Sequence, residues 1–170
     1  AAYGTLLKES NGQNKKVVIG RDGRISGEMV QALVVNTLIS MGLDVINLGL
    51  STTPTVEMAV VTENAAGGII LTASHNPKEW NALKLLNQKG EFISGADGAK
   101  LLEIAAKEDF LFASVDQLGQ VIAGENLLEK HIEACVNYPL VDKDAIQAAN
   151  FSIVIDAIKN TIAAKYIARD

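Results

Sequence analysis

A short apolar run followed at once by a polar loop is the feature that most constrains how this chain folds. Residues 67–72 hold three consecutive aliphatic side chains, Ile69, Ile70 and Leu71, between a glycine pair and a polar segment. Such a run is typical of a strand inside a sheet that is covered on both faces. The next residues place Ser74 just after the carboxyl end of this strand. Ligands of open α/β sheets bind at that edge.

Two more strands and two helices precede this run. The strands are predicted over residues 17–20 and 44–48, and the helices over residues 26–41 and 53–63. Ser26 and Thr53 are candidate N-caps, and Pro54 is a favoured first helical residue. Two consecutive βαβ units with right-handed crossovers make the three strands parallel. The expected fold is therefore α/β, a three-layer αβα domain with a mixed, mainly parallel sheet.

The rest of the chain is predicted to complete this domain and to begin another. Residues 82–86 follow a turn-like segment and are expected to return antiparallel to the third strand. Later helices are predicted from Ser94 or Asp97 to residue 107, over residues 125–137, and from Asp142 onward, with a polar stretch up to residue 124 between the first two. Residues 151–156 resemble a new strand. We therefore expect a first domain at residues 1–149, and at residues 150–170 the first elements of a second, similar domain.

Composition excludes several classes of protein. A formal net charge of -5 argues against a nucleic-acid surface or an anionic membrane as partner. No apolar stretch approaches the roughly 20 residues that a membrane span needs. The single cysteine, Cys135, lies on an apolar helical stripe and is expected in the core, not as a nucleophile. A cytoplasmic location is the default expectation.

Parallel strands bring the loops that follow them to one edge of the sheet. The loop after the first strand carries Arg21 and Arg24, and the loop after the third carries Ser74. Both arginines are therefore expected to face the serine, with Lys84 near the same edge. Asp22 is explained equally well as a partner for an arginine and as a chemical group.

Hydrolase chemistry at this serine is disfavoured because a serine nucleophile needs a base that a third group orients. The chain has two histidines. His75 is adjacent to Ser74, a relation that rarely lets the ring reach the hydroxyl, and no Gly-x-Ser-x-Gly turn surrounds the serine. His131 falls on the apolar stripe of a helix, where a half-buried, hydrogen-bonded histidine is expected. A serine among cationic groups is better suited to carrying a phosphoryl group.

The residues that favour phosphoryl transfer also match a known family. They are residues 18–27 (VIGRDGRISG), Gly49 with residues 53–55 (TPT), residues 67–77 (GGIILTASHNP) and residues 81–84 (NALK). This ordered set closely resembles the first domain of the α-D-phosphohexomutases, which include phosphoglucomutase, phosphomannomutase and phosphoglucosamine mutase. The similarity covers most of residues 15–95.

The resemblance implies a four-domain enzyme that interconverts the 1-phosphate and the 6-phosphate of a hexose. It implies that Ser74 carries the transferred phosphoryl group and that a bisphosphorylated sugar is the intermediate. Mg²⁺ would bind the chain through the phosphate on Ser74, and a hexose bisphosphate would be the activator. The implied partners are a hexose monophosphate and the remaining domains of the parent chain, with no nucleic acid and no membrane.

The resemblance also assigns roles to the neighbours of Ser74. His75 and Asn76 would shape the loop. Lys84 would orient the phosphate and take part in proton transfer, and Arg21 and Arg24 would hold the loop or its phosphate. Ser74, His75 and Lys84 are thus the candidate catalytic residues.

Some family features have no counterpart in the sequence. These are a Gly-Ile-Arg-Gly segment near the N-terminus, a magnesium loop of three aspartates, and the loops that choose the sugar and bind its phosphate. Ala82 stands where many members have glycine. We therefore expect a truncated chain that is inactive alone, and the alternative to a mutase domain is an incomplete domain that at most binds phosphosugars weakly. The sequence does not name the hexose.

Overall fold

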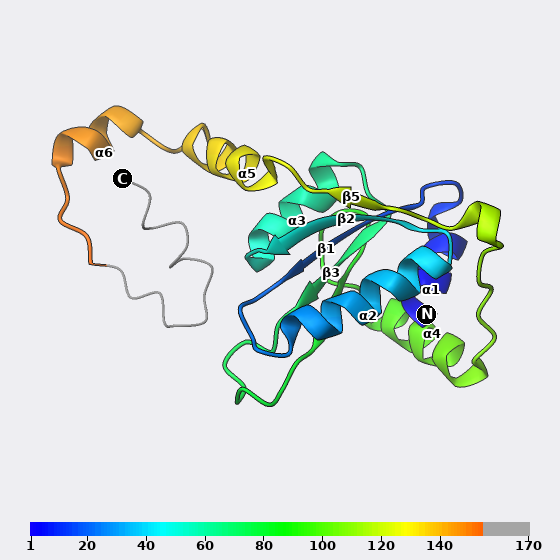
Figure 1. Cartoon of the computed structure of the whole chain (residues 1–170). Coiled ribbons are helices and arrows are strands. Elements are labelled where there is room, and N and C mark those ends of the chain that lie inside the picture. The colour runs from blue at the N-terminus through cyan, green and yellow to red at the C-terminus, as the bar shows by residue number, and fades with distance from the viewer. Residues whose placement is uncertain (155–170) are drawn as a thin grey trace.

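The structure, a computed structural model, describes residues 1–154 and has a five-stranded sheet in the order β4-β3-β1-β2-β5 (Figure 1). The strands are β1 Lys16–Arg21, β2 Asp44–Leu50, β3 Gly67–Leu71, β4 Leu83–Leu86 and β5 Val121–Ala123. The helices are α1 Ala2–Asn11, α2 Gly27–Ser40, α3 Thr53–Thr62, α4 Gly95–Lys107, α5 Leu127–Val136 and α6 Lys143–Ala149, with a 3₁₀ turn η1 at Val115–Gln117. This is the three-layer α/β fold that the sequence predicts.

Strand directions follow the prediction. β1 pairs in parallel with both β2 and β3, and β4 returns antiparallel to β3. β5 pairs in parallel with β2 and was not predicted, since it lies within the stretch expected to be a polar loop. Its three residues are all exposed, so they show no alternation of buried and exposed side chains. The N-terminal helix α1 was not predicted either.

The two faces of the sheet bury different side chains. On one face, α1 and α2 pack on the strands, through residues such as Leu7 and Leu38 against Val17 and Ile19. On the other, α3 packs Val56 and Val60 and α5 packs Leu127, against strand residues that include Val18, Ile46 and Ile70. Successive strand residues thus enter opposite layers, as a pleated strand requires. Every strand side chain of β3 is buried, in agreement with the aliphatic run in the sequence.

Helix starts are set by local polar groups, with two differences from prediction. Ser94 and Asp97 form a reciprocal capping box at α4, and the hydrogen bonds from Ser94 lower the pKa of Asp97. The N-cap of α3 is Thr52, one residue before the predicted Thr53, and its hydroxyl accepts from the Thr55 amide. Ser26 does precede α2 but makes no side-chain cap bond.

The glycine pair at the start of β3 permits close packing. A Cβ on Gly68 would lie 2.7 Å from the side chain of Val60, and one on Gly67 would lie 2.6 Å from the Leu86 carbonyl. Neither position has room for a side chain. The glycine pair therefore allows neighbouring groups to approach the backbone of β3 closely.

The C-terminal part of the described chain differs most from expectation. Asp142 does cap α6, but α6 buries no residue and stands away from the sheet (Figure 1). Residues 151–154 form no strand, and the rest of the strand predicted over residues 151–156 lies outside the described residues. Cys135 is exposed, so its predicted core position is wrong. The apolar stripe correctly predicted the helix α5, but most of the stripe is not covered by other elements within residues 1–154.

The helices can also be compared with the length of a membrane span. None of those within residues 1–154 is long and apolar enough to cross a bilayer.

Candidate functional site

Ser74 lies in the loop that joins β3 to β4, beyond the carboxyl ends of the parallel strands. We call residues 72–82 the serine loop and this side of the sheet the carboxyl edge. Ser74 is exposed and has a φ angle of 53°, in the left-handed region that side chains other than glycine rarely adopt. Its amide donates to the hydroxyl of Thr72 at 3.2 Å. Backbone strain of this kind persists only where surrounding contacts enforce it, and it gathers at functional sites.

Arg24 supplies those contacts. The residue is only 9% exposed, and one terminal nitrogen, Nη2, donates to the carbonyls of Ser74 and Asn76, both at 2.9 Å. The other, Nη1, donates to the carbonyls of Pro77 at 2.8 Å and Trp80 at 2.9 Å. Together these bonds tie four carbonyls of the serine loop to one side chain from the loop after β1.

The remaining donor of Arg24 binds Asp22. Nε lies 3.2 Å from Oδ2 of Asp22, and the other carboxylate oxygen accepts from the Arg24 amide at 3.1 Å. An arginine has five N–H donors. All five are engaged, so Arg24 has no donor left for a phosphate unless it releases the loop. Asp22 is thereby a structural partner of Arg24, one of the two interpretations that the sequence left open.

Two amide side chains complete the serine loop. Asn76 folds back on the turn, its Nδ2 donating to the Ala73 carbonyl at 2.8 Å. Asn81 donates to the hydroxyl of Ser26 at 3.2 Å, which ties the end of the loop to the start of α2. The hydroxyl of Ser26 thus accepts from the serine loop, although it makes no cap bond to its own helix.

The sequence predicted that Arg21 holds the serine loop, but the hydrogen bonds of its side chain go to other residues. Its Nε donates to Oε1 of Gln31 at 3.1 Å, and Gln31 in turn donates to Asn47 at 2.9 Å. The amide of Gly49 also donates to Asn47, at 2.8 Å. This chain of bonds joins the loops after β1 and β2 through a buried glutamine of α2. Sequence reasoning missed Gln31, although a polar residue on the buried face of a helix is a signal that could have found it.

His75 reaches the serine hydroxyl, contrary to the prediction. Its Nδ1 lies 3.3 Å from Oγ of Ser74, and both residues are exposed. The left-handed turn at Ser74 brings the two neighbouring side chains to one side of the loop. Within residues 1–154 no other hydrogen bond holds the ring, so the orienting group of a hydrolase triad is absent from the described residues.

His131 lies where the sequence predicted, half-buried in α5. Its Nδ1 lies 3.0 Å from the hydroxyl of Thr55, a buried residue of α3. The bond fastens α5 to α3, and among the described residues no hydrogen bond joins His131 to the serine loop.

Lys84 is in β4, opposite Ile70 of β3. Its Nζ lies 5.9 Å from the centre of the Phe92 ring. Among the described residues no hydrogen bond or ion pair joins Lys84 to Ser74. Phe92 and Trp80 are both exposed.

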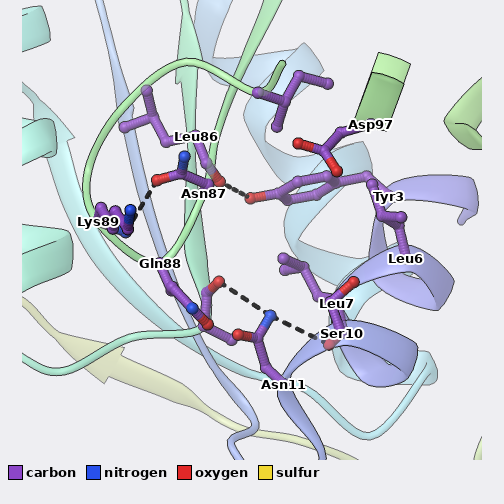
Figure 2. Close-up of a pocket in the computed structure, with 12 residues that line it drawn as sticks. Tyr3, Leu6, Leu7, Ser10, Asn11, Leu86, Asn87, Gln88, Lys89 and Asp97 are labelled. Carbon is purple, nitrogen blue, oxygen red and sulfur yellow. Dashed lines mark hydrogen bonds between the residues drawn. The ribbon is translucent and has the colours of Figure 1, made fainter. Parts of the chain in front are cut away.

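A cavity of about 190 Å³ lies at the opposite side of the sheet, the amino edge (Figure 2). Tyr3 and Asn11 of α1 line one wall, and residues 86–89 line the other. The Tyr3 hydroxyl shares its hydrogen bond between the carbonyls of Leu86 at 2.6 Å and Gly68 at 3.0 Å, while burial raises its pKa well above the ordinary range. This cavity contains none of the predicted site residues.

Comparison with known proteins agrees with the fold and the motif. The family model of phosphoglucomutase/phosphomannomutase, α/β/α domain I, matches residues 1–112. The chain belongs to this family. It is 39% identical over 155 residues to a phosphoglucomutase/phosphomannomutase of Thermococcus kodakarensis, covering 91% of the chain and 33% of that protein.

Other phosphohexomutase relatives give the same picture. A probable phosphoglucosamine mutase of Pyrococcus abyssi is 36% identical over 155 residues, 91% of the chain and 32% of the relative. The crystal structure of a putative phosphomannomutase from Thermus thermophilus superposes with a TM-score of 0.71 at 29% identity, over 90% of this chain and 32% of that one. The chain thus spans about a third of the length of its relatives, and it corresponds to the first domain of the superfamily.

Proposed function

We propose that the chain is the catalytic-serine domain of a phosphohexomutase that interconverts hexose 1-phosphate and hexose 6-phosphate. The observation that carries the proposal is Ser74, an exposed hydroxyl in a left-handed turn whose loop is bound by the buried Arg24. A loop fixed in this way holds its nucleophile in place before the substrate arrives. Phosphoryl transfer depends mostly on such positioning and on electrostatics.

The reaction begins with a phosphoryl group on Ser74. The bond between Oγ and phosphorus breaks, and a new bond forms between phosphorus and the free hydroxyl of the sugar monophosphate. The proton of that hydroxyl passes to the departing Oγ, which becomes the serine hydroxyl again. The resulting hexose bisphosphate turns over and returns its other phosphoryl group to Oγ. A hexose bisphosphate from solution is therefore also the activator that first phosphorylates the serine.

Each neighbour of Ser74 has a proposed part. His75, with Nδ1 at 3.3 Å from the hydroxyl, takes its proton when the serine accepts a phosphoryl group. Asn76 and Arg24 keep the loop in its turn. Lys84 neutralises charge on the phosphoryl group in transit, and Arg21 holds the neighbouring loops through Gln31.

Magnesium requires ligands beyond this part of the protein. Residues 1–154 contain no group of three or more histidine, cysteine, aspartate or glutamate side chains that could hold a metal ion. We propose that Ser74 contributes only its phosphate oxygens to Mg²⁺ and that the other ligands come from the remaining domains. The ion would neutralise charge on the transferring group.

The alternative for the chain alone is an incomplete domain that binds phosphosugars weakly. The lack of a metal-binding cluster within residues 1–154 and the absence of any bond from Lys84 to the serine favour it for the isolated chain. We expect no measurable turnover from the chain alone with Mg²⁺ and bisphosphate present. Robust turnover would show that these residues suffice. A cytoplasmic location, where phosphosugars are metabolised, belongs to the proposal.

The complete enzyme provides the test of function. Glucose, mannose and glucosamine 1-phosphates are supplied one at a time with Mg²⁺ and the matching bisphosphate, and ³¹P spectra follow formation of the 6-phosphate. We expect conversion of at least one sugar, and its loss in Ser74→Ala, which removes the nucleophile. Conversion by Ser74→Ala at the normal rate would exclude the proposed mechanism.

A further inference from the structure

The Lys84 ammonium lies beside the ring of Phe92 in this structure, and no hydrogen bond or ion pair among the described residues joins it to the serine loop. Lys84 pairs with Ile70, and the carboxyl edge lies beyond Leu71 of the same strand. Lys84 and Leu86 share one face of β4 because side chains alternate along a strand. Lys84 is half-buried on that face.

The ring of Phe92 is fixed beside β4 at a level further from Ser74. Phe92 forms a bridge with Leu86, and Leu86 pairs with Gly68, at the start of β3. The Ile93 amide donates to the Leu85 carbonyl at 3.0 Å, so the backbone on both sides of the bridge is held. Phe92 therefore lies two strand positions back from Lys84, about 7 Å toward the amino edge.

The contact between the two side chains is a cation–π interaction. Nζ of Lys84 lies 5.9 Å from the ring centre, within the range in which a ring face attracts an ammonium group. None of the ion pairs among residues 1–154 includes Lys84. Phe92 is 51% exposed, so burial alone does not explain an aromatic residue here.

We propose that Phe92 is a positioning residue that holds the Lys84 ammonium back from Ser74 until the serine carries negative charge. The proposal rests on the proposed function, because it assigns Lys84 to the phosphoryl group. An exposed cation–π contact changes an equilibrium only by a factor of about two to five. A phosphoserine, with a charge of about -1.5 to -2, attracts the ammonium more strongly. Phosphorylation of Ser74 would then draw Lys84 from the ring to the carboxyl edge.

Nuclear magnetic resonance of the chain with ¹³C-labelled lysine tests the resting position. The ring current of Phe92 should shift the Lys84 methylene next to Nζ upfield, and Lys84→Arg identifies that signal. Phe92→Leu should remove the upfield shift, and Phe92→Tyr should retain it. An unchanged Lys84 signal in a folded Phe92→Leu variant would overturn the proposal, as would loss of the shift in both variants.

A matched pair of variants tests the release. Ser74→Glu places a carboxylate in the serine loop, and Ser74→Gln places a neutral side chain of the same shape. We expect the upfield shift of Lys84 to be lost in Ser74→Glu and kept in Ser74→Gln, and equal spectra for the two would contradict the release. Neither result depends on turnover. If Ser74 is never phosphorylated, the proposed function fails even where the Phe92 contact is confirmed.

Discussion

The two edges of the sheet are built from the same strands but differ in what they leave exposed. At the amino edge, the buried hydroxyl of Tyr3 binds two carbonyls, and the cavity beside it is lined mainly by groups that bond to one another (Figure 2). At the carboxyl edge, a buried arginine holds an exposed serine in a strained turn. No buried polar side-chain atom within the described residues lacks a hydrogen-bond partner.

The difference shows that the cavity and the candidate nucleophile lie at opposite edges of the sheet. The amino edge uses polar groups to join α1 and β4 to the sheet, so its loss should cost stability alone. The carboxyl edge uses polar groups to fix one hydroxyl, so its loss should cost both stability and reactivity. Variants at the two edges can separate these effects.

Arg24→Ala should have the largest effect on stability. It removes five hydrogen bonds and leaves Asp22 without its partner, for an expected loss of about 3 kcal/mol in the free energy of unfolding, measured with urea. Arg24→Lys keeps the charge but lacks the planar fork, so it should restore only part of the loss. Full stability in Arg24→Ala would mean that the serine loop does not depend on this side chain.

Lys84→Ala in the complete enzyme should lower kcat and kcat/KM together by roughly 10²-fold, if Lys84 contacts the phosphoryl group chiefly in transit. Lys89→Ala is the matched control, since Lys89 lines the cavity at the amino edge. It should leave both constants unchanged. A raised KM with normal kcat in Lys84→Ala would indicate a ground-state contact.

Tyr3→Phe should cost less, about 1–2 kcal/mol, because it leaves two carbonyls of the amino edge without their donor. Burial raises the pKa of Tyr3 above its usual value of 10.0. The unfolded chain therefore loses the phenol proton first as pH rises, so this part of the stability is complete below pH 10 and declines above it.

The pH dependence of the free energy of unfolding separates the contribution of the Tyr3 hydroxyl from the other contributions to stability. Urea titrations above pH 10 should show the difference in stability between the wild type and Tyr3→Phe becoming smaller. A constant difference would mean that the hydroxyl is solvated. Phosphorylation of Ser74 should be the same in both proteins, which distinguishes this edge from the other.

The sequence was sufficient for the strands that build the carboxyl edge. β3 is buried on both faces and bounded by glycines and a polar loop, so its pattern is hard to reconcile with a helix or a loop. β5 has three exposed residues and showed no pattern. The stripe on α5 predicted an apolar helix face, but such a pattern does not tell whether another element covers that face. Cys135, which lies on the stripe, is exposed.

The sequence predicted which loops form the candidate site, but not which of their side chains contact one another. Arg21 and Arg24 lie in one loop, three positions apart, and no pattern in the sequence tells which guanidinium points to Ser74. The choice depends on α2, where Gln31 binds Arg21 and leaves Arg24 to the serine loop. The contact between Ser74 and His75 depends on the left-handed backbone conformation of Ser74. That conformation cannot be predicted from the sequence, because residues other than glycine rarely adopt it.

Phosphate incorporation at Ser74 tests most directly whether this serine carries the transferred phosphoryl group. The complete enzyme is incubated with Mg²⁺ and a hexose 1,6-bisphosphate, and intact-mass and peptide mass spectrometry locate the added group. We predict one phosphate, on the peptide that contains Ser74, and none in Ser74→Ala. Stable phosphate on another residue, with Ser74 unmodified under the same conditions, would contradict the central claim.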